Sequence, residues 1–173
     1  MTLAPSPAHL TLLSQEGVTA LFQERHDVPP RRRANAEHPR RIVARETLLK
    51  RLCLIGSLAP TAQLSFVVAR VQGLDALAWQ PAAESLQTFA DRVMGLTRAT
   101  DVVGRYTDSS FGVVLQGTGP SAASAVAARL QYHLGQLAEA TRPLSVVVAV
   151  ATGTGVNARA LPEAVLDSLR DCG

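Results

Sequence analysis

Residues 98–116 read RATDVVGRYTDSSFGVVLQ, and this stretch decides the fold. Two runs rich in β-branched and aromatic residues, 102–106 and 111–116, flank the polar residues 107–110. Such a pattern is typical of two antiparallel strands that are joined by a short turn. The sequence therefore predicts a β-hairpin in this part of the chain.

Helical and strand patterns alternate on both sides of this hairpin. Apolar residues recur at steps of three and four in four further segments, which predicts four helices. These helices are expected at 40–55, 83–97, 121–138 and 160–170. The runs 63–72 and 144–151 are rich in β-branched residues, as buried central strands are. The order helix, strand, helix, hairpin, helix, strand, helix predicts an α/β or α+β fold in which helices cover a sheet.

The N-terminal part of the chain has a different composition. Residues 7–25 carry apolar side chains at helical spacing, which predicts a short amphipathic helix. Residues 26–39 are rich in Pro and Arg, and a Pro-Pro pair precedes three arginines, as in a stiff, extended linker. We therefore expect an N-terminal helix and linker at 1–38 and one folded domain at 39–173.

Positive charge is concentrated near the start of that domain. Residues 24–51 hold nine of the 17 Lys and Arg residues and four of the 14 Asp and Glu residues. One interpretation is an electrostatic handle for phosphates, nucleic acid or an acidic partner, and the other is a solvated hinge. No aromatic side chains interleave with Arg31–Arg33 to stack bases, so nucleic acid is the weaker hypothesis.

Several classes of protein are excluded by composition. No apolar run approaches the roughly 18 residues that a membrane span needs. Cys53 and Cys172 lie too far apart for a metal-binding CxxC pair, and the four histidines show no metal-ligand spacing. We therefore expect a cytoplasmic protein with reduced thiols, no metal site and no cofactor.

The stretch 98–111 resembles the centre of a GGDEF domain, the diguanylate cyclase family. In that family an RxxD motif leads into a strand, which ends at the five-residue GGDEF hairpin turn. The resemblance continues through 112–118, 127–130 and 145–151. It covers roughly residues 40–173 and implies a five-stranded sheet flanked by helices, as in class III nucleotidyl cyclases.

The catalytic positions of the family are degenerate in this chain. At the GGDEF position stand Thr107, Asp108, Ser109, Ser110 and Phe111, of which only the Phe survives. In the family, a carboxylate at the third motif position and another on the first strand hold the metal ions of the reaction. Ser109 and Arg70 stand at these two positions, and Thr107 replaces a glycine of the tight turn. The resemblance therefore implies an inactive domain that is not an enzyme.

No other chemistry is expected at this turn. Asp108, Ser109 and Ser110 have no His or Lys near them in sequence to act as a base. Asp and Ser are ordinary turn residues, so we interpret these three as a polar hairpin turn without catalytic residues.

The product-binding motif of the family is retained. In active members RxxD is the inhibitory site that binds cyclic di-GMP, and Arg98 and Asp101 fill it here. Arg129 occupies the place of a second arginine that commonly completes the site. An Arg fork can reach O6 and N7 of guanine, while a carboxylate accepts from the guanine N–H groups. The alternatives are structural: a helix-end charge, a turn cap and a solvated helix residue.

These residues predict a cyclic di-GMP receptor in bacterial second-messenger signalling. Arg98, Asp101 and Arg129 would hold the ligand, and the segment 24–51 or the first helix would transmit the bound state. The expected recipient is a protein partner or a second copy of the chain. The alternative is a protein-interaction or dimerisation module that keeps the fold and binds no nucleotide.

Overall fold

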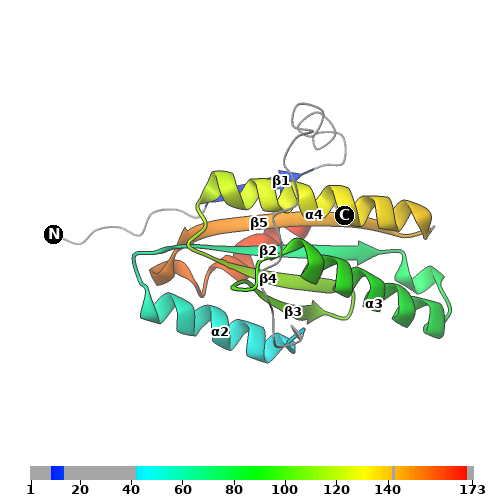
Figure 1. The fold of residues 1–173 in the computed structure, drawn as a ribbon, viewed down its shortest axis with the longest axis horizontal. Helices are drawn as coiled ribbons and strands as arrows, with labels where there is room; N and C mark the ends of the chain where they lie inside the picture. The colour runs from blue at the N-terminus through cyan, green and yellow to red at the C-terminus, as the bar shows by residue number, and fades with distance from the viewer. Residues whose placement is uncertain (1–8, 14–41, 142, 171–173) are drawn as a thin grey trace.

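The computed structural model describes residues 9–13, 42–141 and 143–170 (Figure 1). Its strands form one antiparallel sheet in the order β1-β5-β2-β4-β3. The strands are β1 (His9–Leu13), β2 (Gln63–Gln72), β3 (Val102–Thr107), β4 (Ser110–Gln116) and β5 (Ser145–Thr154). The helices are α2 (Arg45–Leu58), α3 (Trp79–Leu96), α4 (Pro120–Ala140) and α5 (Leu161–Arg170), with 3-10 turns η1 (Leu74–Ala76) and η2 (Gly155–Asn157).

Helices cover both faces of the sheet, which explains why successive residues in the middle of its central strands are apolar and buried. Along β2, Val67 and Ala69 pack against α3 and α4, whereas Phe66 and Val68 pack against α2 and α5. Figure 1 shows α4 lying along β5 on the first of these faces. The predicted α+β fold with a helix-covered sheet is confirmed, and every predicted strand and helix from residue 42 onward is present.

A pair of glycines lets α2 approach the sheet closely. Gly104 on β3 and Gly112 on β4 are directly paired. A Cβ on Gly112 would lie 2.6 Å from Cδ2 of the buried Leu48, and one on Gly104 would lie 2.9 Å from the Val43 carbonyl oxygen. Val43 pairs with β3, because its N–H donates to the Val103 carbonyl (3.0 Å) and its carbonyl accepts from Arg105 N (2.8 Å). The start of α2 is therefore fixed to the outer edge of β3.

The predicted hairpin is present, and it closes without a glycine. The register shifts between Arg105 and Thr107, so Tyr106 forms a β-bulge. The Tyr106 ring is buried and meets the Phe66 ring edge-on at 5.4 Å. Among the described residues no residue other than glycine has a positive φ. The bulge thus accommodates Thr107 without the backbone conformation that favours glycine.

The prediction for the N-terminus is wrong where the structure describes it. Residues 9–13 form strand β1, which pairs with β5 from Thr152 to Val148, and not part of a helix over 7–25. This strand supplies the fifth member of the sheet, since only four strands lie between residues 63 and 154. The remaining parts of the predicted helix and linker fall outside the described residues.

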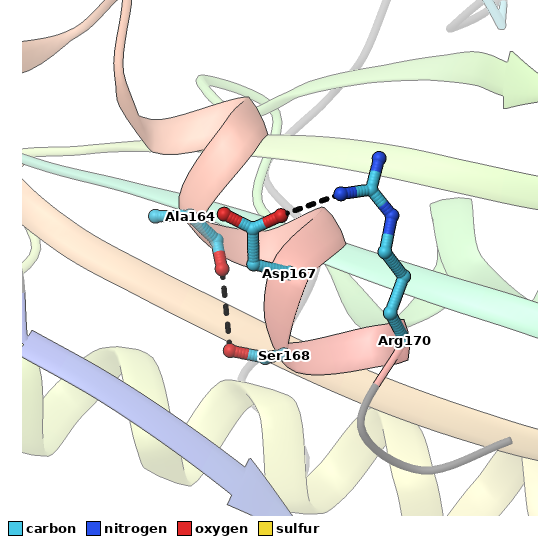
Figure 2. Close-up of polar contacts among 4 residues, drawn as sticks. All are labelled: Ala164, Asp167, Ser168 and Arg170. Carbon is cyan, nitrogen blue, oxygen red and sulfur yellow. Dashed lines mark hydrogen bonds and ion pairs between the residues drawn. The ribbon is translucent and has the colours of Figure 1, made fainter.

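The last helix, α5, is held against the sheet by buried apolar side chains and not by its exposed polar contacts. On its exposed side, Arg170 pairs with Asp167 (Nη1 to Oδ1, 2.8 Å) and the Ser168 hydroxyl donates to the Ala164 carbonyl (3.2 Å; Figure 2). An exposed i,i+3 ion pair contributes only a few tenths of a kcal/mol. The buried Leu161, Val165 and Leu169 attach α5 to the sheet instead.

None of the described helices is both long and apolar enough to cross a membrane.

Candidate functional site

The predicted RxxD motif forms the turn between α3 and β3. Asp101 closes this turn, because its Oδ2 accepts from Arg98 N (2.7 Å) and its N–H donates to the Arg98 carbonyl (3.1 Å). The Gln116 side chain, at the end of β4, donates to the Thr100 carbonyl (2.8 Å). The backbone of the turn is therefore fixed from two directions while the Arg98 side chain is exposed. The predicted alternative role of Asp101 as a turn cap is confirmed.

Arg129 reaches this turn from another helix. Its Nη2 donates to the carbonyl of Leu96, the last residue of α3, at 2.6 Å. The last turn of α3 has no basic residue of its own, so Arg129 supplies the positive charge that favours a helix C-terminus. Its Nε is buried and has no hydrogen-bond partner. Arg129 is thus a half-buried bridge between α4 and α3, not the solvated helix residue of the alternative interpretation.

Two further residues on α3 and α4, Arg92 and His133, were not among the predicted site residues. Burial, followed by the charges of Arg92 and then Arg129, lowers the pKa of His133 below its ordinary value. The ring of His133 also meets the Tyr132 ring edge-on at 5.2 Å. The i,i+4 spacing of Arg129 and His133 could have predicted that these two side chains are neighbours on one face of a helix. The positive charges of Arg92 and Arg129 thus both act on His133 and, with burial, favour its neutral imidazole form.

The second predicted turn, between β3 and β4, uses its polar groups internally. The hydroxyls of Thr107 and Ser110 are 2.6 Å apart, and Ser109 N donates to Thr107 Oγ1 (3.4 Å). The Ser109 carbonyl accepts from Val71 N (2.8 Å), which ties the turn to the end of β2. Ser110 and Phe111 are fully buried. The turn is therefore a closed structural hairpin.

The charges around this turn are mainly positive. Arg70 on β2 lies directly opposite Ser110 in the strand register. Arg105 donates to the Asp108 carbonyl (3.4 Å) and lies over the Phe111 ring, 5.2 Å from its centroid. Asp108 is exposed and is the one carboxylate between residues 105 and 111. In the described part of the chain no three His, Cys, Asp or Glu side chains cluster as metal ligands would.

Solved structures with a similar fold include GGDEF domains of diguanylate cyclases. The active GGEEF domain of a diguanylate cyclase from Vibrio cholerae matches with a TM-score of 0.63 at 16% identity, over 76% of this chain and 93% of that one. The GGDEF domain of DgcB from Caulobacter crescentus, solved in complex with c-di-GMP, matches with a TM-score of 0.55 at 16% identity, over 85% and 94%. At such identities the likeness concerns the fold.

A third solved structure adds a protein complex. Diguanylate cyclase SiaD from Pseudomonas aeruginosa, solved with its activator SiaC, matches with a TM-score of 0.59 at 22% identity, over 74% of this chain and 55% of that one.

No curated protein sequence shows a significant match to this chain. The family profile "Diguanylate cyclase, GGDEF domain" matches residues 76–167, more than half of the chain. The chain therefore belongs to the GGDEF domain family of c-di-GMP signalling proteins, as the resemblance predicted.

Proposed function

We propose that this chain is a catalytically inactive GGDEF domain that acts in the cytoplasm as a receptor for cyclic di-GMP. The observation that carries the proposal is the hydrogen bond from Arg129 to the Leu96 carbonyl (2.6 Å). This bond brings the third predicted ligand-binding residue, from α4, against the end of α3 that continues into the RxxD turn. Arg129, which is distant in sequence, thus lies beside the exposed turn that contains Arg98 and Asp101.

Each of the three residues has a role that suits a guanine dinucleotide. The exposed Arg98 guanidinium presents a planar fork, which matches O6 and N7 of a guanine. The Asp101 carboxylate is an acceptor for guanine N–H groups. Arg129 uses one of its five donors on Leu96, and its positive charge favours the negative phosphodiesters.

The absence of catalysis follows from the second turn. Two-metal phosphoryl transfer needs carboxylates that offset the charge of the metals and of a triphosphate. At the corresponding positions Arg70 is positive, and Ser109 has a neutral side chain while its backbone carbonyl accepts a hydrogen bond from Val71 N on β2. The hydroxyls of Thr107 and Ser110 are bonded to each other. This arrangement favours a structural hairpin over a magnesium–GTP site.

Titration calorimetry with cyclic di-GMP tests the proposal, with GTP and cyclic di-AMP as competitors of different base or size. We expect binding of cyclic di-GMP alone, and a rise in melting temperature with ligand concentration by mass action. Arg98→Ala should reduce this rise at a given ligand concentration. Arg159→Ala is the matched control, because it removes an exposed arginine on the η2 side of the domain. No binding at hundred-micromolar ligand by the wild-type chain would overturn the receptor function.

A docking module that binds no nucleotide is the second candidate function. It is favoured by the internal bonds of Asp101 and Arg129, which give both residues a structural role without any ligand. The Trp79 side chain, 87% exposed at the start of α3, is also more typical of a protein contact than of a solvent-facing helix. This candidate predicts that Arg98→Ala leaves partner binding unchanged.

A further inference from the structure

The two edges of the sheet are covered in different ways. The outer edge of β3 pairs with Val43, directly before α2. The outer edge of β5 is covered by β1, which pairs with residues 148–152. An uncovered edge exposes a row of backbone N–H and C=O groups and acts as a template for another strand. Each cover therefore prevents pairing with a second chain.

The edge under β1 is unusually prone to such pairing. Strand β5 reads SVVVAVATGT and contains no charged residue and no proline. Val148 and Val150 are buried on one face of the sheet, and Ala149 and Ala151 are buried on the other. A neutral, β-branched strand of this kind pairs readily with an identical strand. The strand most complementary to an exposed β5 is therefore β5 of another copy.

Strand β1, which covers the outer edge of β5, is short. Residues 14–41, here called the tether, connect it to the rest of the domain. β1 has five residues against the ten of β5, and among the described residues nothing else pairs with the outer edge of β5. Residues 14–41 connect β1 to the segment that pairs with β3, so they join the two edges of the sheet. Because β1 is covalently part of the same chain, its effective concentration at this edge exceeds that of a strand from a second copy in dilute solution. A short edge strand nevertheless opens at low cost.

We propose that β1 is a displaceable guard strand, and that the uncovered outer edge of β5 pairs antiparallel with β5 of a second copy. The two copies are related by a two-fold axis, because the same edge is used on both. Four strands of each copy then form one continuous sheet. The tether keeps the chain monomeric at ordinary concentrations, and loss of β1 makes it dimeric. This inference is independent of cyclic di-GMP binding.

Proline substitutions in the full chain test the proposal. Adjacent N–H groups of a strand point to opposite sides, so Leu10→Pro and Thr11→Pro together remove at least one bond between β1 and β5. Light scattering of the purified variants should show a doubling of mass as protein concentration rises. Thr11→Ala keeps every backbone N–H and should remain monomeric like the wild type. Folded proline variants that stay monomeric at high concentration contradict the proposal.

A peptide separates edge pairing from general loss of stability. The peptide SPAHLTLLSQE, residues 6–16, should return the dimeric variant to the monomer, because it restores the cover in trans. A scrambled peptide of the same composition is the control. If the dimer persists at saturating peptide, its interface is not the edge of β5.

The wild-type chain offers a measurement that needs no variant. Hydrogen exchange should be much faster for the β1 amides than for those of the central strands β2 and β4, because β1 opens alone. Equal protection of β1 and β2 would show that β1 is a permanent part of the sheet, and the guard role would be wrong even where the proline variants fail to fold.

Discussion

Two turns flank β3, and they differ in where their polar groups point. In the turn before β3, at 98–101, backbone and carboxylate bonds fix the chain while the Arg98 side chain stays exposed. In the turn after β3, at 107–110, the hydroxyls bond to each other and Ser110 is fully buried. The first turn presents a functional group to solvent, whereas the second uses its groups to close a hairpin. The two ends of β3 thus differ: the turn before it exposes the Arg98 side chain, and the hydroxyls of the turn after it are hydrogen-bonded within the hairpin.

The largest expected effect is a complete lack of cyclase activity. Purified protein with GTP and magnesium or manganese should form no cyclic di-GMP, which chromatography of the products would measure. Ser109→Asp with Ser110→Glu should also fail, because Arg70 remains opposite position 110 and the buried Ser110 site does not accommodate a charge. Product formation by the wild type, lost on mutation of Arg105, would show that the second turn is catalytic.

The next effect is on ligand affinity at the first turn. Arg98→Ala should weaken cyclic di-GMP binding by about 5- to 150-fold, corresponding to about 1–3 kcal/mol for a lost bidentate contact. Asp101→Asn should weaken binding while leaving the melting temperature nearly unchanged, since an amide oxygen still accepts from Arg98 N. Calorimetry and thermal unfolding measure the two properties separately. Equal affinities for cyclic di-GMP in the wild type and in Arg98→Ala would show that the turn at 98–101 does not bind the ligand.

For the free energy of unfolding, we expect the second turn to matter more than the first. Ser110→Ala removes the bond to Thr107 and should lower the free energy of unfolding by about 0.5–1.5 kcal/mol, a normal value for one neutral hydrogen bond. Arg98→Ala, which truncates an exposed side chain, should change it by less than about 0.5 kcal/mol. Urea unfolding of both variants measures this contrast. A larger loss in Arg98→Ala would mean that the first turn is structural too.

The smallest effect concerns pH and His133. Burial and the charges of Arg92 and Arg129 lower its pKa, so the folded state binds this proton less readily than the unfolded chain. Stability from this group is therefore fully present above the unfolded value of about 6.5 and is lost as pH falls toward the lower folded pKa. His133→Gln should flatten the decline in urea midpoint between neutral and mildly acidic pH. An unchanged pH profile in this variant would contradict the pKa direction.

Most of the fold could be predicted from residue 42 onward, because hydrophobic periodicity there agrees with the final packing. The error at β1 has a physical cause. Leu10 and Leu13 fit a helical face, while Leu10 and Leu12 fit a strand, and five residues alone do not decide between the two. The conformation is decided by β5, more than 130 residues later in the chain, whose outer edge pairs with no other strand among the described residues. Pairing with β5 in the tertiary structure therefore determines the conformation of residues 9–13, and their local hydrophobic pattern does not.

The sequence predicted Arg98, Asp101 and Arg129 as candidate site residues and the capping role of Asp101, but not the hydrogen bond of Arg129. Arg98 and Asp101 follow from a motif of four positions, and Arg129 follows from family resemblance. The bond from Arg129 to Leu96 depends on how α4 crosses the end of α3, which no local spacing encodes. The bulge at Tyr106 likewise depends on the space beside Phe66 and shows why loss of the turn glycines is tolerated.

The pairing of β1 with β5 has a consequence for protein synthesis. Residues 9–13 leave the ribosome long before Val148 and Thr152 are made. At about 5–20 residues per second, β1 waits on the order of ten seconds for its partner strand. When β5 is finally released, the guard strand is already present on the same chain, and loop closure within one molecule is faster than collision with another. The aggregation-prone strand is thus the last of the sheet to be made, and the strand that covers it is the first.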